Sequence, residues 1–280
     1  MDYRITTDLI DLRDLDWTHL SGTSGAGGTC LKSFYDLPSG RVYYKLSRFE
    51  EGVGIVGHES VNEIIADRLM QKLCINHLPC QLLHALVRIA GEEYETWICA
   101  SESYRKRGES KCSLELFYRL MHQEGEDMLS FCRRMGWETE AYQMLLLDYL
   151  IANRDRSAEG IEVIQEARTG NMRLAPIHDQ GSSLLFQYRE DSVASELDVM
   201  RDISIRSFAG TKSSFENLTL LPKGKALVHP LAEEDREDIF YQTDSVLSRT
   251  FQDKIWEMIW KRWEHYEAVC NQGSGKQSGD

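Results

Sequence analysis

Two aspartates that follow regularly patterned segments constrain the fold of this chain more than any other feature. The apolar run LLLDYLIAN, which is typical of a buried helix, leads up to Asp155, and Asp179 precedes Gly181 in the segment LAPIHDQG. Between them lie two β-like stretches, residues 161–164 and 173–177, joined by the turn Arg-Thr-Gly-Asn. The pattern predicts a helix and then a β-hairpin that carries both carboxylates to one end.

This order of carboxylates suits the transfer of a phosphoryl group. A carboxylate after the helix can accept the proton of an attacking hydroxyl, and a carboxylate in an Asp-x-Gly turn can bind the Mg²⁺ that accompanies ATP phosphates. Each motif alone also has an ordinary interpretation, because an Asp beside Arg is often a solvated ion pair and Asp-Gln-Gly is a good turn sequence. The two together make Asp155 the candidate catalytic base and Asp179 the candidate metal ligand.

Composition narrows the class of protein further. The 280 residues carry a formal charge of −13 and no basic stripe, which argues against nucleic acid as a partner. The acidic start of the chain lacks the basic and apolar regions of a signal peptide, and no window approaches eighteen apolar residues, so we expect a cytoplasmic protein with no membrane partner. The seven cysteines are scattered and never form Cys-x-x-Cys, so they predict neither disulfides nor a zinc site.

Two differently patterned regions divide the chain. The first reads as β, β, α, β, β, which predicts an antiparallel sheet with one helix. The second is mainly helical, with apolar spacing typical of helices at residues 113–122, 128–134, 138–152 and 235–270. We therefore predict an α+β fold with an N-terminal nucleotide-binding lobe at residues 1–100, a helical C-terminal catalytic lobe at residues 101–270, and a disordered tail at residues 271–280.

A glycine-rich stretch, GTSGAGGT, precedes the first predicted hairpin. Glycines let backbone N–H groups approach phosphate oxygens, although the same composition also suits an ordinary flexible turn. The stretch lacks the Gly-Lys-Ser/Thr ending of a Walker loop, so a loop that covers phosphates is the better interpretation. Its candidate nucleotide-binding residues are Gly22, Thr23, Ser24 and Gly25.

Lys45 follows the glycine-rich stretch by one hairpin, in the alternating strand VYYKL. A strand lysine is often an edge or snorkelling residue, but kinase folds keep the lysine that binds the α- and β-phosphates at this position. Glu59 and Glu63 lie one turn apart on the next helix, and either is a candidate partner for Lys45. We prefer Glu63 because it lies deeper in the apolar pattern. Cys99 and Ser101 complete the candidate nucleotide-binding set.

As a set, these motifs resemble the HipA-like serine/threonine kinases, a distant branch of the protein-kinase-like fold. The matching stretches are GTSGAGGTCLKS, YYKLS, GHESVNEIIADRL, DYLIANRDR and LAPIHDQGSSLL. The resemblance implies a two-lobed protein-kinase-like fold and an ATP- and Mg²⁺-dependent enzyme, with Lys45 on the phosphates, Asp155 as the catalytic base and Asp179 on the metal. Full-length toxin kinases of this family carry an additional N-terminal module, so we expect a catalytic domain alone.

The loop after Asp155 departs from the family pattern. HipA-like kinases usually continue Asp-Arg-His-x-x-Asn, and that Asn helps to hold a metal ion, whereas this loop reads Asp-Arg-Ser-Ala-Glu-Gly and ends at Gly160. Glu159 is the candidate replacement ligand, since Mg²⁺ prefers carboxylate oxygen.

Three functions stay open on these grounds. The first is a kinase that phosphorylates Ser or Thr of a protein substrate. The second is a pseudokinase that binds nucleotide and acts through a regulatory protein partner, which the glycine at position 160 favours. The third is a purely structural helical adaptor. The oligomeric state has no signal in the sequence.

Overall fold

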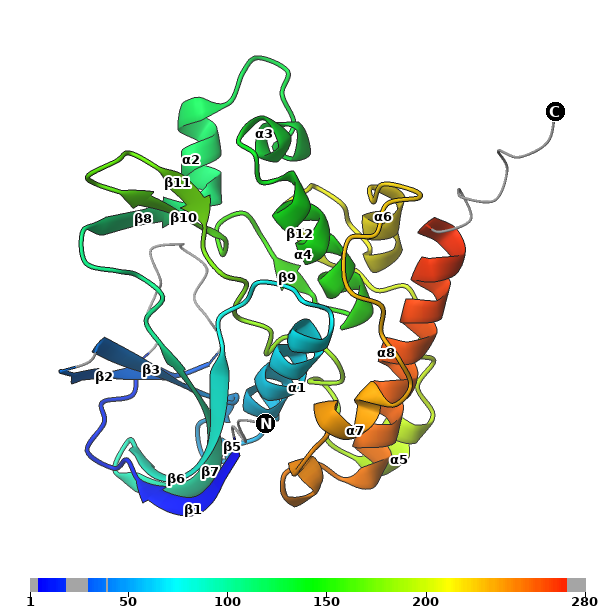
Figure 1. The fold of residues 1–280 in the computed structure, drawn as a ribbon. Helices are drawn as coiled ribbons and strands as arrows, with labels where there is room; N and C mark the ends of the chain where they lie inside the picture. Colours follow the sequence, from blue (N-terminus) through cyan, green and yellow to red (C-terminus); the bar gives the residue numbers. More distant parts are fainter. Residues whose placement is uncertain (1–4, 19–29, 39, 271–280) are drawn as a thin grey trace.

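The structure, a computed structural model, describes residues 5–18, 30–38 and 40–270. The chain has the predicted α+β fold, with an N-terminal β-sheet on one side and a mainly helical C-terminal region on the other (Figure 1). The candidate residues Gly22, Thr23, Ser24 and Gly25, and the predicted tail at residues 271–280, lie outside the described residues. The division into lobes at residues 100 and 101 stays a prediction.

Two predicted hairpins and one additional strand form the N-terminal sheet. The hairpins pair antiparallel as expected, and Gly91, with φ of +91°, makes the tight turn of the second hairpin. The additional strand departs from the all-antiparallel expectation, because it pairs parallel with its neighbour, Ile5 opposite Leu82. Ile5 is its one buried side chain, so its sequence carries no apolar alternation. The strands are β1 (Ile5–Asp11), β2 (Lys32–Leu37), β3 (Gly40–Leu46), β6 (Cys80–Ile89) and β7 (Glu92–Glu102), in the order β1-β6-β7-β3-β2.

Helix α1 (Glu59–Lys72) lies between this sheet and the helical region (Figure 1). It contacts β6 and β7 on one side and α7 (Asp235–Ile239) on the other, which explains why its apolar residues are fully buried. The same helix buries five polar side chains, Glu59, Ser60, Asn62, Glu63 and Asp67. Carboxylates are almost never buried unless they are paired, so this helix carries more than a packing function.

The second predicted hairpin is present and belongs to a three-stranded sheet. Its strands β10 (Glu162–Glu166) and β11 (Met172–Leu174) pair antiparallel, as predicted between Asp155 and Asp179. The third strand, β8 (Glu109–Ser113), pairs with β10 and was not predicted, because its sequence ESKCS shows no apolar alternation. Two short pairs, β4 (Phe49–Glu50) with β5 (Gly54–Ile55) and β9 (Asp155–Arg156) with β12 (Arg206–Ser207), complete the strands of the described residues.

Helices pack around α4 (Glu138–Leu150), whose residues 144–147 are at most 3% exposed. The predicted helices at residues 113–122, 128–134 and 138–152 all form, and the predicted C-terminal block divides into α7, a 3₁₀ turn and α8. Trp256 and Trp263 on α8 are buried in the core, and Trp260 is partly buried against it. The remaining helical elements are α2 (Leu114–Met121), α3 (Met128–Arg134), α5 (Asp191–Ser195), α6 (Ser214–Thr219), η1 (Thr243–Ser245) and α8 (Arg249–Cys270). Of the helices within the described ranges, none combines the length and the apolar sequence that crossing a bilayer requires.

A buried ion pair fixes the segment that follows α4. Asp148, near the end of α4, is 2% exposed and accepts hydrogen bonds from the Arg156 guanidinium at 3.1–3.2 Å and from the Asn153 amide at 2.8 Å. Arg156 also donates to the His178 carbonyl oxygen at 2.8 Å. Both aspartate-bearing segments are therefore attached to α4 through one guanidinium.

We expect Asp148→Asn to lower the free energy of unfolding by about 3 kcal/mol, because the substitution leaves a buried guanidinium without its counter-charge. The matched control is Asp36→Asn, which breaks the Asp36–Arg41 pair, with side chains 63% and 39% exposed, and should change stability little. Chemical denaturation of the three proteins measures the difference. Equal destabilisation by both variants would contradict the structural importance of the buried pair.

Candidate active site

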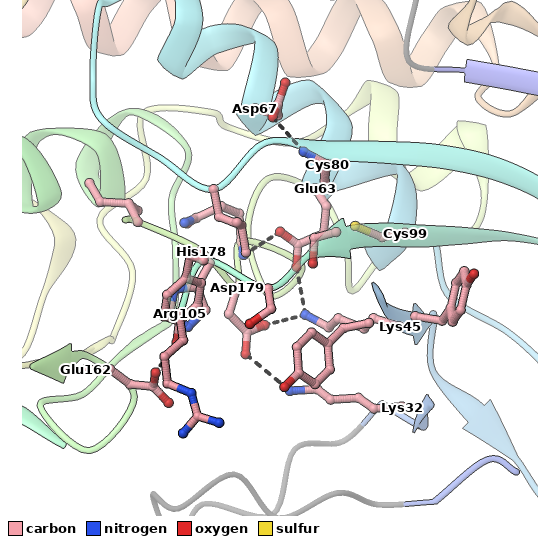
Figure 2. A pocket seen from close by; sticks show the side chains of 18 of the residues that line it. Lys32, Lys45, Glu63, Asp67, Cys80, Cys99, Arg105, Glu162, His178 and Asp179 are labelled. Atoms are coloured by element: carbon pink, nitrogen blue, oxygen red, sulfur yellow. Dashed lines mark hydrogen bonds and ion pairs between the residues drawn. The ribbon is translucent and has the colours of Figure 1, made fainter. Parts of the chain in front are cut away.

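The predicted nucleotide-binding residues that the structure describes meet in one cavity of about 250 Å³. The N-terminal sheet and α1 form one wall, and β10 together with the segment before Gly181 forms the other (Figure 2). The predicted residues that line the cavity are Lys45, Glu63, Cys99, Ser101 and Asp179. The cavity therefore joins residues more than a hundred positions apart in the sequence.

The Glu63 carboxylate connects three parts of this cavity. It pairs with the Lys45 ammonium at 2.7 Å, which is the predicted ion pair between the sheet and α1. It also accepts hydrogen bonds from the backbone N–H of Gln180 at 2.8 Å and of Gly181 at 3.0 Å. Glu59, the alternative partner, instead accepts from the backbone N–H of Arg48 at 3.1 Å. One buried carboxylate thus sets the position of Lys45 relative to the Asp179 turn.

The close approach of this turn to α1 favours glycine at position 181. A Cβ on Gly181 would lie 3.1 Å from the Cβ of Glu59, 3.2 Å from the Lys45 nitrogen and 3.4 Å from a Glu63 oxygen. The side-chain amide of Asn62 reinforces the approach by donating to the Gly181 and Ser183 carbonyl oxygens at 3.3 and 2.9 Å. The Asp-x-Gly sequence therefore has a steric reason here beyond turn formation.

Asp179 projects from this turn toward two lysines (Figure 2). Its φ of +66° lies in the left-handed region, which few residues other than glycine adopt and which is common at functional sites. Its carboxylate pairs with Lys45 and lies 3.6 Å from the Lys32 nitrogen. The charges of Lys45 and then Lys32 hold the pKa of Asp179 well below its ordinary value, so this carboxylate is ionised at neutral pH.

The same charges keep Lys45 protonated. Burial of the ammonium acts to lower its pKa, but Asp179 and Glu63 outweigh that effect and raise the pKa of Lys45 well above its ordinary value. Lys45 is therefore a permanent cation at the end of the cavity, and it is suited to bind an anion.

Lys32 is a cavity residue that the sequence did not point out. It lies directly opposite Lys45 in the β2–β3 hairpin, and in an antiparallel pair such residues project from the same face of the sheet. The register of the predicted hairpin could have identified it. Two adjacent lysines give this end of the cavity a stronger attraction for phosphate than Lys45 alone would give.

Asp155 and Glu159 lie outside the cavity lining, and both face Arg206. The Asp155 carboxylate is 3.7 Å and the Glu159 carboxylate 3.4 Å from the Arg206 guanidinium, and all three side chains are 43–58% exposed. The Asp155 segment still adjoins the Asp179 turn, because the N–H of Arg154 donates to the Ser182 carbonyl oxygen at 3.2 Å. The two backbone segments therefore adjoin, while the meeting of both carboxylates and the catalytic and metal-binding roles of Asp155 and Glu159 stay predictions.

A second polar group lies at the other end of the cavity and was also missed. Glu162 on β10 binds Lys111 of β8 and the Tyr104 hydroxyl, and all three residues line the cavity. Glu162 is the one polar residue within the run IEVI, and the spacing of apolar residues there gave no reason to expect a functional side chain.

Metal-binding potential in the cavity rests on Asp179. No group of three or more His, Cys, Asp or Glu residues that could hold a metal ion occurs in the described part of the chain. Mg²⁺ often needs only one or two protein carboxylates, because substrate phosphates and water fill its other positions. Asp179, ionised and half exposed, fits that mode of binding.

Comparison with solved structures defines the fold. The structure is similar to that of a Helicobacter pylori proinflammatory kinase, CtkA, with a TM-score of 0.67 and 15% sequence identity over 94% of this chain and 96% of that chain. The fold is therefore protein-kinase-like. The golgi casein kinase has a TM-score of 0.44 and 12% identity, over 89% of this chain and 71% of that chain. No protein-family model matches the sequence, and a search of curated proteins finds no match.

Lys45 and Glu63 should act as one unit in nucleotide binding. We expect Lys45→Met and Glu63→Gln each to weaken the binding of ATP about tenfold or more, because each substitution removes or misplaces the buried cation. The double variant should be no weaker than the weaker single variant, and calorimetric titration of all four proteins measures this coupling.

The control is the exposed Arg88–Glu93 pair at the far end of the same sheet. Arg88→Met and Glu93→Gln should leave the affinity for ATP unchanged. Additive losses at Lys45 and Glu63 would mean that the two residues act separately.

Proposed function

We propose that this protein is a HipA-like kinase that transfers the γ-phosphoryl group of ATP to a Ser or Thr hydroxyl of a protein substrate. The observation that carries the proposal is the group Lys45, Glu63 and Asp179 at one end of a cavity in a protein-kinase-like fold. The similar Helicobacter pylori protein is a kinase, which supports the same assignment.

The cations of the cavity would bind and orient the triphosphate. Lys45 is held in place by Glu63 and points to the space beside Asp179, and Lys32 adds a second ammonium from the opposite strand. Positioning and charge stabilisation supply most of the catalysis of phosphoryl transfer, because the protein has little covalent chemistry to perform. The described geometry is suited to that task.

Asp179 would hold Mg²⁺ together with phosphate oxygens and water. Bound Mg²⁺ neutralises charge on the phosphates. Gly160 offers no side chain to a second ion, and the Glu159 carboxylate faces Arg206. Asp179 pairs with both Lys45 and Lys32 in this structure. When ATP and Mg²⁺ bind, Asp179 must therefore release at least one of these lysines to contact the ion, and the released lysine would contact the phosphates instead.

Asp155 would accept the proton of the substrate hydroxyl. To do so it must leave Arg206, from which it is separated by 3.7 Å in an exposed and weak contact. The cost of that movement is small because both side chains are about half exposed. An arriving substrate is therefore able to displace Arg206 from Asp155.

The second candidate function is a pseudokinase that binds nucleotide and acts through a regulatory protein partner. Two observations favour it: the glycine at position 160, and the pairing of Arg206 with both Asp155 and Glu159. In this case the cavity binds ATP but does not turn it over. Thermal stabilisation by ATP without turnover is the result that separates the pseudokinase from the enzyme, because a bound ligand stabilises the native state whether or not it reacts.

Asp179→Asn should remove the Mg²⁺-dependent part of ATP binding. The amide keeps the size of the side chain but lacks the charge that attracts a cation, so we expect at least about a tenfold loss in affinity for Mg²⁺·ATP. Thermal shift with ATP, with and without Mg²⁺, measures the effect, and circular dichroism checks the fold. Equal Mg²⁺·ATP binding by variant and parent would exclude Asp179 from the site.

Gly160→Asn should increase phosphoryl transfer if a missing metal ligand limits the enzyme. The site has room, because a Cβ at this position would lie 3.5 Å from the Ser157 carbonyl oxygen, an ordinary contact. A restored metal ligand would help the ion to stabilise the charge of the transition state, so we expect the rate of phosphoryl transfer to increase about tenfold. Single-turnover assays compare the parent, Gly160→Asn and Gly160→Ala. The alanine variant removes the flexibility of glycine without adding an oxygen ligand, so a gain found only in Gly160→Asn comes from the added ligand. Equal rates in all three, at the level of an ordinary kinase, would show that position 160 does not limit catalysis.

A further inference from the structure

The cavity contains a buried carboxylate that the proposed phosphate site does not use. Glu162 on β10 is 9% exposed and lines the cavity. One of its oxygens accepts from the Lys111 ammonium at 2.6 Å, and the other accepts from the Tyr104 hydroxyl. An ionised carboxylate has about four lone-pair sites, so after these two contacts it retains acceptors for a ligand.

The surroundings of Glu162 and Tyr104 set the protonation states of both groups. Burial acts to raise the pKa of Glu162, but the hydrogen bonds from Lys111 and Tyr104 outweigh it, so the pKa is lowered. Burial, together with the neighbouring Glu162 charge, raises the pKa of the Tyr104 phenol. The carboxylate is therefore ionised and accepts hydrogen bonds only, while the phenol stays protonated and donates to it.

This polar group lies at the opposite end of the cavity from the lysines. Figure 2 shows Glu162 on one side of the pocket and Lys45 and Lys32 on the other, with Asp179 between them. The register of the sheet agrees with this separation. Lys45 lies opposite Cys99 on β7, and β7 continues for three more residues beyond Cys99, a length of about 10 Å. Tyr104, which binds Glu162, follows the end of that strand. A ligand whose phosphates contact Lys45 would extend its other end toward Glu162.

We propose that Glu162 is the residue that determines which nucleoside the cavity accepts, and that it does so by accepting hydrogen bonds from N–H or O–H groups of the nucleoside. Lys111 and Tyr104 act as positioning residues that hold the carboxylate ionised and in place. This proposal rests on the proposed function, since it takes the ligand to be a nucleoside triphosphate. A ligand that lacks donors at this end removes water from the remaining lone pairs of the carboxylate without replacing its hydrogen bonds, and it binds more weakly for that reason.

Packing alone does not account for this group. Burying an ion pair costs free energy because both charges lose their water, and an apolar pair of similar size would avoid that cost. A buried ion pair therefore often stabilises a protein no more than an apolar pair would. The apolar residues of the same strand, Val163 and Ile164, are 2% and 1% exposed and already attach β10 to the core. A carboxylate at the cavity wall is therefore better explained by recognition of a polar ligand.

The test compares the affinities of ATP, 2′-deoxy-ATP, inosine triphosphate and inorganic tripolyphosphate, each with Mg²⁺, for the parent, Glu162→Gln, Tyr104→Phe and Glu109→Gln. Glu109 is the matched control, because it is a carboxylate of the same sheet that binds Arg173 at 3.0 Å and does not line the cavity. Circular dichroism and melting temperature verify that each variant folds. Tyr104→Phe keeps the ring and so provides a test even if Glu162→Gln is unstable.

We expect Glu162→Gln to lower the affinity for ATP about tenfold and Tyr104→Phe to lower it about threefold. Both variants should bind tripolyphosphate with the affinity of the parent. If the ligand donor is a sugar hydroxyl, the parent prefers ATP over 2′-deoxy-ATP. If it is the amine of the base, the parent prefers ATP over inosine triphosphate. In either case Glu162→Gln removes the preference, and Glu109→Gln retains it.

Two results would overturn the inference. The first is an unchanged preference among the nucleotides in Glu162→Gln and Tyr104→Phe, and the second is an equal loss for ATP and tripolyphosphate, which would mark a general disturbance of the cavity. A parent protein that binds neither ATP nor tripolyphosphate would instead refute the proposed function itself, and the selectivity proposal with it.

Discussion

The Glu63 carboxylate is the contact on which the geometry of the cavity depends. It lies on a helix packed between a sheet and a set of helices, and it binds at once the Lys45 ammonium of the sheet and two backbone N–H groups of the Asp179 turn. A buried carboxylate is costly unless it is fully bonded, so these three donors are also the reason that it tolerates burial. Loss of this one side chain would remove the contact that joins Lys45, α1 and the backbone of the turn, and the pairs of Asp179 with Lys45 and Lys32 would then remain to join the sheet to the turn.

The Asp155 segment is fixed on the opposite side by a second buried carboxylate. Asp148 holds the Arg156 guanidinium, which in turn binds the carbonyl oxygen that precedes Asp179. Both halves of the candidate site are thus attached through buried charges rather than through apolar contacts alone. Such contacts have direction and distance requirements, and this property suits a site that must position phosphates and a hydroxyl.

Much of the fold followed from the sequence because apolar periodicity reports burial. The long helices, both N-terminal hairpins and the hairpin before Asp179 follow apolar patterns and were predicted. The strands β1 and β8 are polar and lie at sheet edges, and the short helices α5 and α6 bury few apolar residues, so these four elements were not predicted. The pairing of Lys45 with Glu63 followed from helical spacing and strand order. Lys32 was missed although it lies opposite Lys45 in a hairpin that was predicted, whereas Glu162 was missed because its partner Lys111 lies on β8, a strand that was not predicted. The pairing of Arg206 with Asp155 joins segments about fifty residues apart that no local pattern connects. The glycine-rich residues Gly22 to Gly25 lie outside the described residues, so their proposed contact with phosphate stays a prediction.

The central claim is that the cavity binds a nucleoside triphosphate with its phosphates between the lysines and Asp179. The most direct test is a crystal structure of the protein with Mg²⁺ and a non-hydrolysable ATP analogue. We predict phosphate oxygens within hydrogen-bonding distance of the Lys45 and Lys32 nitrogens, Mg²⁺ bound to the Asp179 carboxylate, and the nucleoside next to Glu162. An analogue that binds elsewhere, or that leaves Asp179 paired with both lysines and without a metal ion, would contradict this account.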